Sequence, residues 1–499
     1  MASAPPWAAA LRRQLVGRFG GDGLLSREVF DLVENRGSWK EIQGLVEGCS
    51  SLPWQRSWAE SSRDPGRLWE RAEHAAADRR TALMCALLAA PRHALLARHR
   101  LQAGGLEGLQ ELSRSQPFSL SGLSAARAAG LDAQASDVRW ARAARNALAE
   151  WRGAVASALL RAGGAALARQ ADVAGRTALH YAASVADRTA VSLLLDAGAD
   201  ADAVDGFGRT AAHVAAAHGH ESLGLDLLAA ARGGKVAAEQ RRDGFGRTVG
   251  ETLRASLRGR STVEIRSGIS WDELFREYAA VGRPLLLRGG AADLPATLKW
   301  SDPRQLEAAV GTQLPLAVGL IPYELGGKST TLAKFVEAEA GVAARERSGT
   351  GGRRGPRPYI FDVSVGQRRP EVLRDVAFLD DGVRDKYVAY VRQPQLGIGY
   401  KDAGAPMHTH HAALNALFVG TKRWFLTPPP SSFWTFTPSH DWEASEQCRR
   451  LRSEGLLLEL TQQAGDLLFV PEQWGHATLL EEYGVGVGQE FIPNTSMSS

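Results

Sequence analysis

A ten-residue phrase recurs along the middle of the chain and restricts how this part can fold. AGRTALHYAA at 174–183 returns as FGRTAAHVAA at 207–216, and a more divergent copy, FGRTVGETLR, lies at 245–254. Gly175 and Gly208 occupy the same place in the first two copies and are 33 residues apart. A unit of this length holds a short helical pair that cannot bury its apolar face alone, so several units must stack. The spacing therefore predicts a stack of helices here.

The phrase and its period resemble ankyrin repeats. The resemblance implies ankyrin-type helical repeats over 78–260, clearest over 172–235, with two clear units. His180 and His213 fall where ankyrin units carry a structural histidine, so we do not expect them to bind metal. Because stacked repeats offer long concave surfaces, we expect the region to bind a protein partner or protein substrate. A spacer packed against the following domain is the alternative.

Two further segments, 404–430 and 465–476, bring histidines into strand-like surroundings. Alternate residues of a strand point to the same face, so His408 and His410 can direct two imidazoles at one point. His476, from a strand far along the chain, can supply a third. Three ligands on one face of a metal ion leave its other positions open, as in non-haem iron oxygenases. Imidazole suits iron, zinc and copper alike, so the ligands alone leave the metal undecided.

The same segments resemble the metal-binding core of JmjC-type, cupin-like 2-oxoglutarate oxygenases. The family pattern Gly-x-Lys-Arg-Trp-x-Leu-x-Pro-Pro matches 420–429, and the distal pattern that ends in Trp-x-His matches 465–476. Three flanking segments also match: RPLLLRG (283–289), PYIFD (358–362) and LGIGYKDAGAPMH (396–408). The resemblance implies a JmjC/cupin-like domain over 262–499, built as a double-stranded β-helix barrel. The chain is then an α+β multidomain protein with an all-α N-terminal part.

The resemblance also implies residue roles. His408, His410 and His476 would hold Fe(II), with 2-oxoglutarate as co-substrate. Lys422 would anchor the distal carboxylate of 2-oxoglutarate, and a buried ammonium indeed needs an anion to remain charged. Asn415 stands where one branch of the family has an asparagine that helps to hold the co-substrate. The implied activity is that of a dioxygenase, with a protein side chain as the expected substrate for hydroxylation.

His410 departs from the family pattern, because most members have a carboxylate there. Leu480, Gly488 and Ala405 also replace polar residues of better-matched members, and His411 is expected to face away from the metal. Two alternatives therefore stay open. One is a catalytically lapsed, cupin-like scaffold whose histidines hold a structural metal such as zinc, acting as a protein-interaction module. The other is a three-histidine cupin dioxygenase that acts on a small molecule without 2-oxoglutarate.

Composition narrows the setting. Lys and Arg number 59 against 55 Asp and Glu, and this mixed balance does not support nucleic-acid binding. The cysteines, Cys49, Cys85 and Cys448, are scattered and odd in number, which excludes a disulfide framework and favours a reducing compartment, cytoplasmic or nuclear. No apolar run approaches the roughly 20 residues that span a bilayer, so no membrane association is expected.

Several local expectations remain. Residues 1–77 are expected to be helical and irregular, and their first 22 positions faintly resemble an organelle transit peptide, with an ordinary first helix as the alternative. SWDELFREYAAVG (270–282) predicts a helix that Ser270 caps. The Gly- and Arg-rich segment 343–357 predicts a mobile loop.

Overall fold

The structure is a computed structural model that describes residues 168–493 except 233, 320–327, 349–356, 380, 434 and 436, together with 160, 165 and 166. The predicted helical region 1–77 and the first part of the predicted repeat region lie outside the described residues. Two compact units divide the chain: one ends at Gly250, and the other runs from Glu251 to the end and includes Ala217–Gly219.

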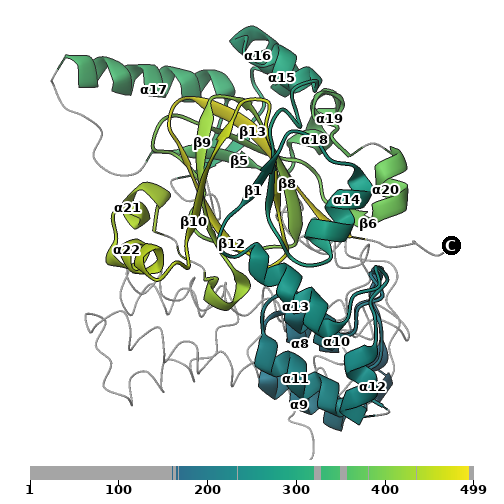
Figure 1. Ribbon diagram of the computed structural model, residues 1–499. Helices are drawn as coiled ribbons and strands as arrows, with labels where there is room; N and C mark the ends of the chain where they lie inside the picture. The colour runs from purple at the N-terminus through teal and green to yellow at the C-terminus, as the bar shows by residue number, and fades with distance from the viewer. Residues whose placement is uncertain are drawn as a thin grey trace, which may run out of the picture. The chain divides into compact units, whose positions relative to one another are not determined.

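Pairs of short helices build the first unit, as its sequence period predicts (Figure 1). Gly175 and Gly208 lie in the turns before these pairs with φ of 71° and 66°, values that L side chains rarely adopt. A Cβ on Gly208 would lie 2.6 Å from the backbone nitrogen of Gly244, in the next turn. The helices are α8 (Ala178–Ser184), α9 (Arg188–Asp196), α10 (Ala211–Ala217), α11 (Glu221–Ala230) and α12 (Gly234–Gln240), and α13 (Val249–Arg258) follows them.

His180 is a structural residue that ties one repeat to the next. Its Nδ1 accepts the backbone N–H of Thr177 at 3.1 Å, so the ring proton lies on Nε2. Nε2 lies 3.0 Å from the backbone oxygen of Arg209, to which it donates. His213 repeats the arrangement with Thr210 and with the oxygen of Arg247. These contacts account for both histidines without a metal.

Acidification is expected to destabilise the repeats. Burial lowers the pKa of His180 and of His213. The unfolded chain, with histidine pKa near 6.5, then binds more protons, and stability falls as pH drops below that value by up to about 1.4 kcal/mol per pH unit and histidine. We expect the urea midpoint for loss of helical circular dichroism to fall between pH 7 and pH 5.5. The double variant His180→Gln, His213→Gln should start lower and show a flatter profile; equal slopes would contradict this explanation.

The second unit is dominated by two sheets. In the described part of the chain, ten strands form one sheet in the order β1-β2-β11-β8-β13-β7-β5-β3-β4, with β6 also paired to β13, and β10-β9-β12 form the other. The strands are β1 (Glu264–Arg266), β2 (Leu285–Leu287), β3 (Leu316–Gly319), β4 (Lys328–Thr330), β5 (Tyr359–Asp362), β6 (Val388–Val391), β7 (Gln395–Gly399), β8 (Ala412–Val419), β9 (Thr421–Thr427), β10 (Leu458–Gln463), β11 (Leu467–Val470), β12 (Gly475–Leu480) and β13 (Gly484–Pro493).

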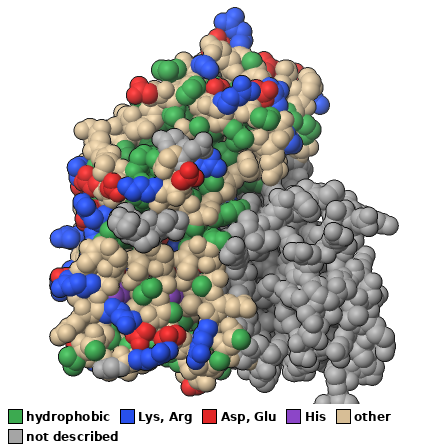
Figure 2. Space-filling model, turned by 90° about the vertical axis from the view of Figure 1, so that its right-hand side faces the viewer, with side chains coloured by type: hydrophobic (Ala, Val, Ile, Leu, Met, Phe, Trp, Pro, Cys, Tyr) green, Lys and Arg blue, Asp and Glu red, His purple; other side chains and the backbone are tan. Residues whose placement is uncertain are grey.

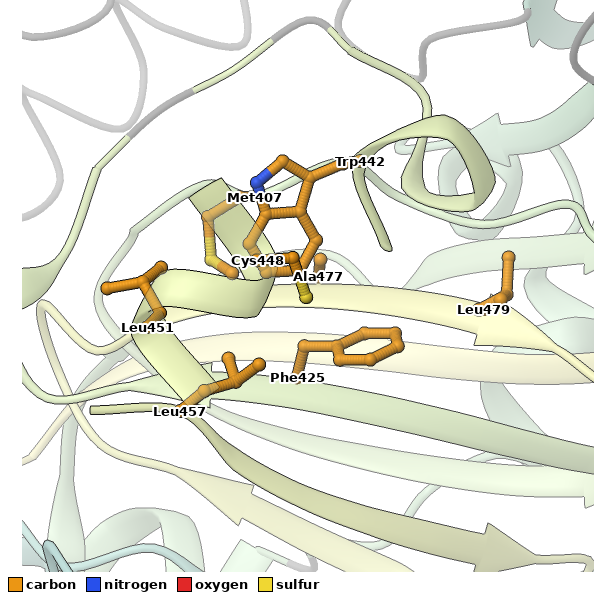
Figure 3. Close-up of a cluster of buried hydrophobic side chains, with 8 residues drawn as sticks. All are labelled: Met407, Phe425, Trp442, Cys448, Leu451, Leu457, Ala477 and Leu479. Atoms are coloured by element: carbon orange, nitrogen blue, oxygen red, sulfur yellow. The ribbon is translucent and has the colours of Figure 1, made fainter. Parts of the chain in front are cut away.

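Alternation along β9 places its residues on two different cores. Trp424 and Leu426 face the large sheet and pack with buried residues of β2 and β11. Phe425 faces the other way, against α21 (Ser439–Glu443) and α22 (Glu446–Ser453). That outer cluster contains Met407, Phe425, Trp442, Cys448, Leu451, Leu457, Ala477 and Leu479 (Figure 3). Because both faces of β9 are buried, its register is strongly specified.

The remaining helices flank the sheets in sequence order. They are α14 (Trp271–Leu274), the π-helical η3 (Phe275–Ala279), α15 (Pro295–Lys299), α16 (Pro303–Val310), α17 (Leu332–Arg347), α18 (Val365–Arg368), α19 (Pro370–Asp375), α20 (Asp381–Tyr387) and the 3₁₀ turn η4 (Pro429–Ser431). Ser270 caps α14 as predicted, since its side chain accepts the N–H of Glu273 at 3.1 Å. No helix in the described ranges has the length and apolar character needed to cross a membrane.

The predicted loop at 343–357 is wrong at both of its ends. Helix α17 continues to Arg347, because the apolar spacing that starts it at Leu332 extends into the Ala-rich part of the segment. At the other end, Arg357 donates to the buried carboxylate of Glu339 at 2.8 Å. A buried carboxylate needs such a partner, and this requirement holds Arg357 against the helix. The visible face of the described residues carries charges of both signs, as the composition predicts (Figure 2).

Candidate metal centre and its pocket

The structure brings His408, His410 and His476 together. One ring nitrogen of each lies within 4.8 Å of the others. The ring centroids are 4.1 Å apart for His408 and His476, 4.5 Å for His410 and His476, and 5.2 Å for His408 and His410. Backbone hydrogen bonds of 3.0 and 2.9 Å join His408 to His476, so the two distant segments are fixed to each other at the site.

Backbone carbonyls orient the three rings. Nδ1 of His408 lies 2.8 Å from the oxygen of Pro406, and Nδ1 of His476 lies 3.0 Å from the oxygen of Trp474. Nδ1 of His410 contacts the oxygen of His411 at 2.6 Å. A carbonyl only accepts, so each Nδ1 carries the proton and each Nε2 carries the lone pair that a metal ion needs. The three residues are therefore in the tautomer that suits metal binding.

Burial also prepares the rings for a metal. It lowers the pKa of His408 well below its ordinary value and that of His476 to about 3, and the neighbouring rings lower both further. Both imidazoles are neutral at physiological pH, so neither has to release a proton when an ion binds. Three neutral nitrogen donors on one side of an ion fit a divalent first-row transition metal.

His411 lies outside this group, which agrees with its predicted orientation. Its Nδ1 lies 3.0 Å from a carboxylate oxygen of Glu472, and both side chains are about one-tenth exposed. His411 follows His410 directly, so it points to the opposite side of the chain.

A pocket of about 540 Å³, including its open mouth, adjoins the histidines. Glycines create much of its space, because Gly484, Gly486 and Gly488 of β13 share one face of the strand. A Cβ on Gly397 of β7, which pairs with Gly486, would collide with the hydroxyl of Tyr359. Gly488, where better-matched family members carry a polar residue, borders the pocket beside Asn415.

Lys422 lines the same pocket and is 3% exposed. Its Nζ lies 3.4 Å from Oδ1 of Asn415 and 5.5 Å from the ring centre of Trp424. Burial lowers the pKa of Lys422 to about 8. Among the described residues no carboxylate lies within ion-pair distance of this ammonium, so its anion has to come from a ligand. The structure thus places Lys422 and Asn415 side by side, as their proposed roles require.

Sequence reasoning missed Glu490. This β13 residue is 5% exposed and lines the pocket together with the three histidines. It has the same parity along the strand as Gly488, so alternation from that glycine inward would have found it. Tyr359 was quoted only as part of a matching segment, and it also borders the pocket.

Comparison with known proteins identifies both units. A family model for ankyrin repeats matches three copies over residues 145–244. The prediction of two clear units was therefore too low, because the earliest copy lacks the recurring phrase by which the others were found.

The relatives of the second unit carry JmjC names. JmjC domain-containing protein 8 of Homo sapiens is 35% identical over 222 residues, 44% of this chain and 80% of that protein. Lysine-specific demethylase JMJ21 of Arabidopsis thaliana is 30% identical over 258 residues, 46% of this chain but 25% of that protein. Arginine-specific demethylase JMJ22 of Arabidopsis thaliana is 25% identical over 252 residues, 46% of each. The chain thus spans less than half of either demethylase.

Proposed function

Because the chain belongs to the JmjC-domain proteins and joins that domain to ankyrin repeats, we propose that it is an Fe(II)- and 2-oxoglutarate-dependent dioxygenase that hydroxylates a protein side chain. The observation that carries the proposal is the buried ammonium of Lys422, which shares one pocket with three converging imidazoles. A metal site alone would fit many functions. A metal site beside a buried cation fits a co-substrate that chelates the metal at one end and has a carboxylate at the other.

In this proposal each residue has a separate task. His408, His410 and His476 hold the metal, which together with 2-oxoglutarate and dioxygen supplies the oxidising power for hydroxylation. Lys422 and Asn415 hold the distal carboxylate and so fix the orientation of the co-substrate. The apolar walls beside the histidines, which include Trp424 and Val470, exclude water from the reacting groups.

We further propose the domain organisation that the sequence predicts. Residues 262–499 form the JmjC/cupin-like domain, in which the two sheets make the double-stranded β-helix, and 78–260 form the repeats that bind a protein partner or substrate. Residues 1–77 form a separate helical region. A cytoplasmic or nuclear location remains a prediction from the cysteine content.

A catalytically lapsed scaffold is the second candidate, and His410 favours it. The metal ligands of this chain are all neutral, whereas the usual carboxylate at that position would add one negative charge. A structural ion such as zinc tolerates a closed site with imidazole ligands. The chain would then act as a protein-interaction module that contains the same metal site.

Succinate formation separates the two candidates. The purified chain is reconstituted with Fe(II) without oxygen, 2-oxoglutarate and air are added, and succinate is measured for wild type, His408→Ala and His410→Asp. The oxygenase proposal expects succinate from wild type at least about 10-fold above the His408→Ala background, since that variant lacks a ligand. Succinate from His410→Asp alone would identify a lapsed enzyme. Succinate from neither would contradict the oxygenase proposal.

A further inference from the structure

Glu490 places a carboxylate beside the candidate metal centre. In the register of β13 and β8 it lies opposite Ala413, three residues after His410. It lines the pocket that the three histidines line, but its oxygens are outside the group of atoms that lie within 4.8 Å of one another. Glu490 therefore neighbours the site from a different strand without belonging to the ligand set.

The carboxylate of Glu490 is ionised and only partly satisfied. Gln395 donates to Oε1 at 2.7 Å. Arg392 Nη1 lies 3.3 Å from Oε2 without hydrogen-bond geometry, so this buried oxygen accepts no hydrogen bond within the described part of the chain. Burial raises the pKa of Glu490, but Arg392, His410 and His411 together lower it below its ordinary value. Since the Arg392 side chain is 29% exposed, water screens part of its charge.

We propose that Glu490 supplies, from outside the ligand set, the negative charge that the three-histidine metal centre lacks. The usual member of the family has that charge on the ligand that His410 replaces here. A dication held by three neutral rings is attracted by a buried carboxylate in the same low-dielectric pocket. This makes Glu490 a positioning residue for the ion. The inference rests on the proposed metal site and does not require turnover.

A double-mutant cycle tests the inference by metal affinity. The dissociation constant for Co(II) is measured by calorimetry for wild type, Glu490→Gln, His410→Asp and the double variant, at one pH. Glutamine keeps the size of the side chain and removes its charge. We expect Glu490→Gln to weaken Co(II) binding about 10-fold in the wild-type background, as residues that support metal ligands do. In the His410→Asp background the loss should be under about 3-fold, because the ligand then brings its own charge.

Matched controls separate charge from structure. Glu339→Gln removes another buried carboxylate with an arginine partner, remote from the pocket lining, and should leave Co(II) affinity unchanged. Glu490→Gln with Arg392→Gln avoids an unpaired arginine, should fold if the single variant does not, and should show the same 10-fold loss. Unchanged affinity in Glu490→Gln, or equal losses in both His410 backgrounds, would overturn the inference. A protein that shows the cycle but makes no succinate would lose only the oxygenase proposal.

Discussion

Replacing His476 by alanine is expected to abolish tight metal binding by this protein. His476 is the ligand that β12 contributes, and without it His408 and His410 remain as two donors from one segment. Loss of one of three ligands should weaken Co(II) or Zn(II) binding by about 100-fold or more, since even residues that only support a ligand cost 10- to 100-fold. Calorimetric titration of the metal-free protein measures this directly.

Thermal stability gives a second readout for His476→Ala. An ion that binds only the folded state at 100 times its dissociation constant stabilises that state by about 2.7 kcal/mol. Wild type should therefore melt at a higher temperature with metal than without, and His476→Ala should not respond. His411→Ala is the matched control, because that ring pairs with Glu472 outside the ligand group. If His411→Ala lost metal while His476→Ala kept it, the ligand assignment would be wrong.

Replacing Lys422 by methionine is expected to weaken co-substrate binding and to stabilise the protein at the same time. Removing one partner of a buried ion pair costs about 2–5 kcal/mol of binding, so 2-oxoglutarate affinity should drop by about 30-fold or more. In the protein without ligand, the ammonium is buried beside Asn415 with no carboxylate within ion-pair distance among the described residues. Methionine removes the cost of that burial, and the gain at pH 7 should reach up to about 3 kcal/mol.

The pH dependence fixes the sign of this prediction. Burial lowers the pKa of Lys422 to about 8, below its unfolded value near 10.4. Wild type should therefore gain stability as pH rises from 8 towards 10, and Lys422→Met should lack that gain. Above pH 8, wild-type affinity for 2-oxoglutarate should decline as the ammonium loses its proton. Lys401→Met replaces an exposed lysine and should change neither quantity. A Lys422→Met protein that binds 2-oxoglutarate normally would remove this residue from the site.

Local patterns were sufficient wherever a short rule connects sequence to geometry. Strand alternation placed Trp424 and Lys422 on the inward face of β9, and it separated His411 from His410. The cap at Ser270 followed from the preference of a serine side chain for an N-terminal N–H. These relations involve residues a few positions apart, so the backbone period alone decides them.

Relations across strands were not accessible in the same way. Nothing local in β13 says that its neighbours are β8 on one side and β7 on the other. That order brings Glu490 to the pocket and places the glycines of β13 and β7 opposite each other. The attachment of Arg357 to Glu339 likewise depends on how the chain returns after α17. Such neighbours are chosen by long-range packing, which the residues of one segment do not encode.

The sequence by itself determined the repeat period, the histidine pair on one strand face and the lysine on the inward face of the next strand. Each follows from the fixed geometry of a helix or a strand. Only the tertiary structure decided that His476 meets that pair, that Lys422 is buried beside Asn415, and that Glu490 lies in the same pocket. The physical reason is that the order and register of the sheet set which side chains share a cavity, and their burial there sets their charge.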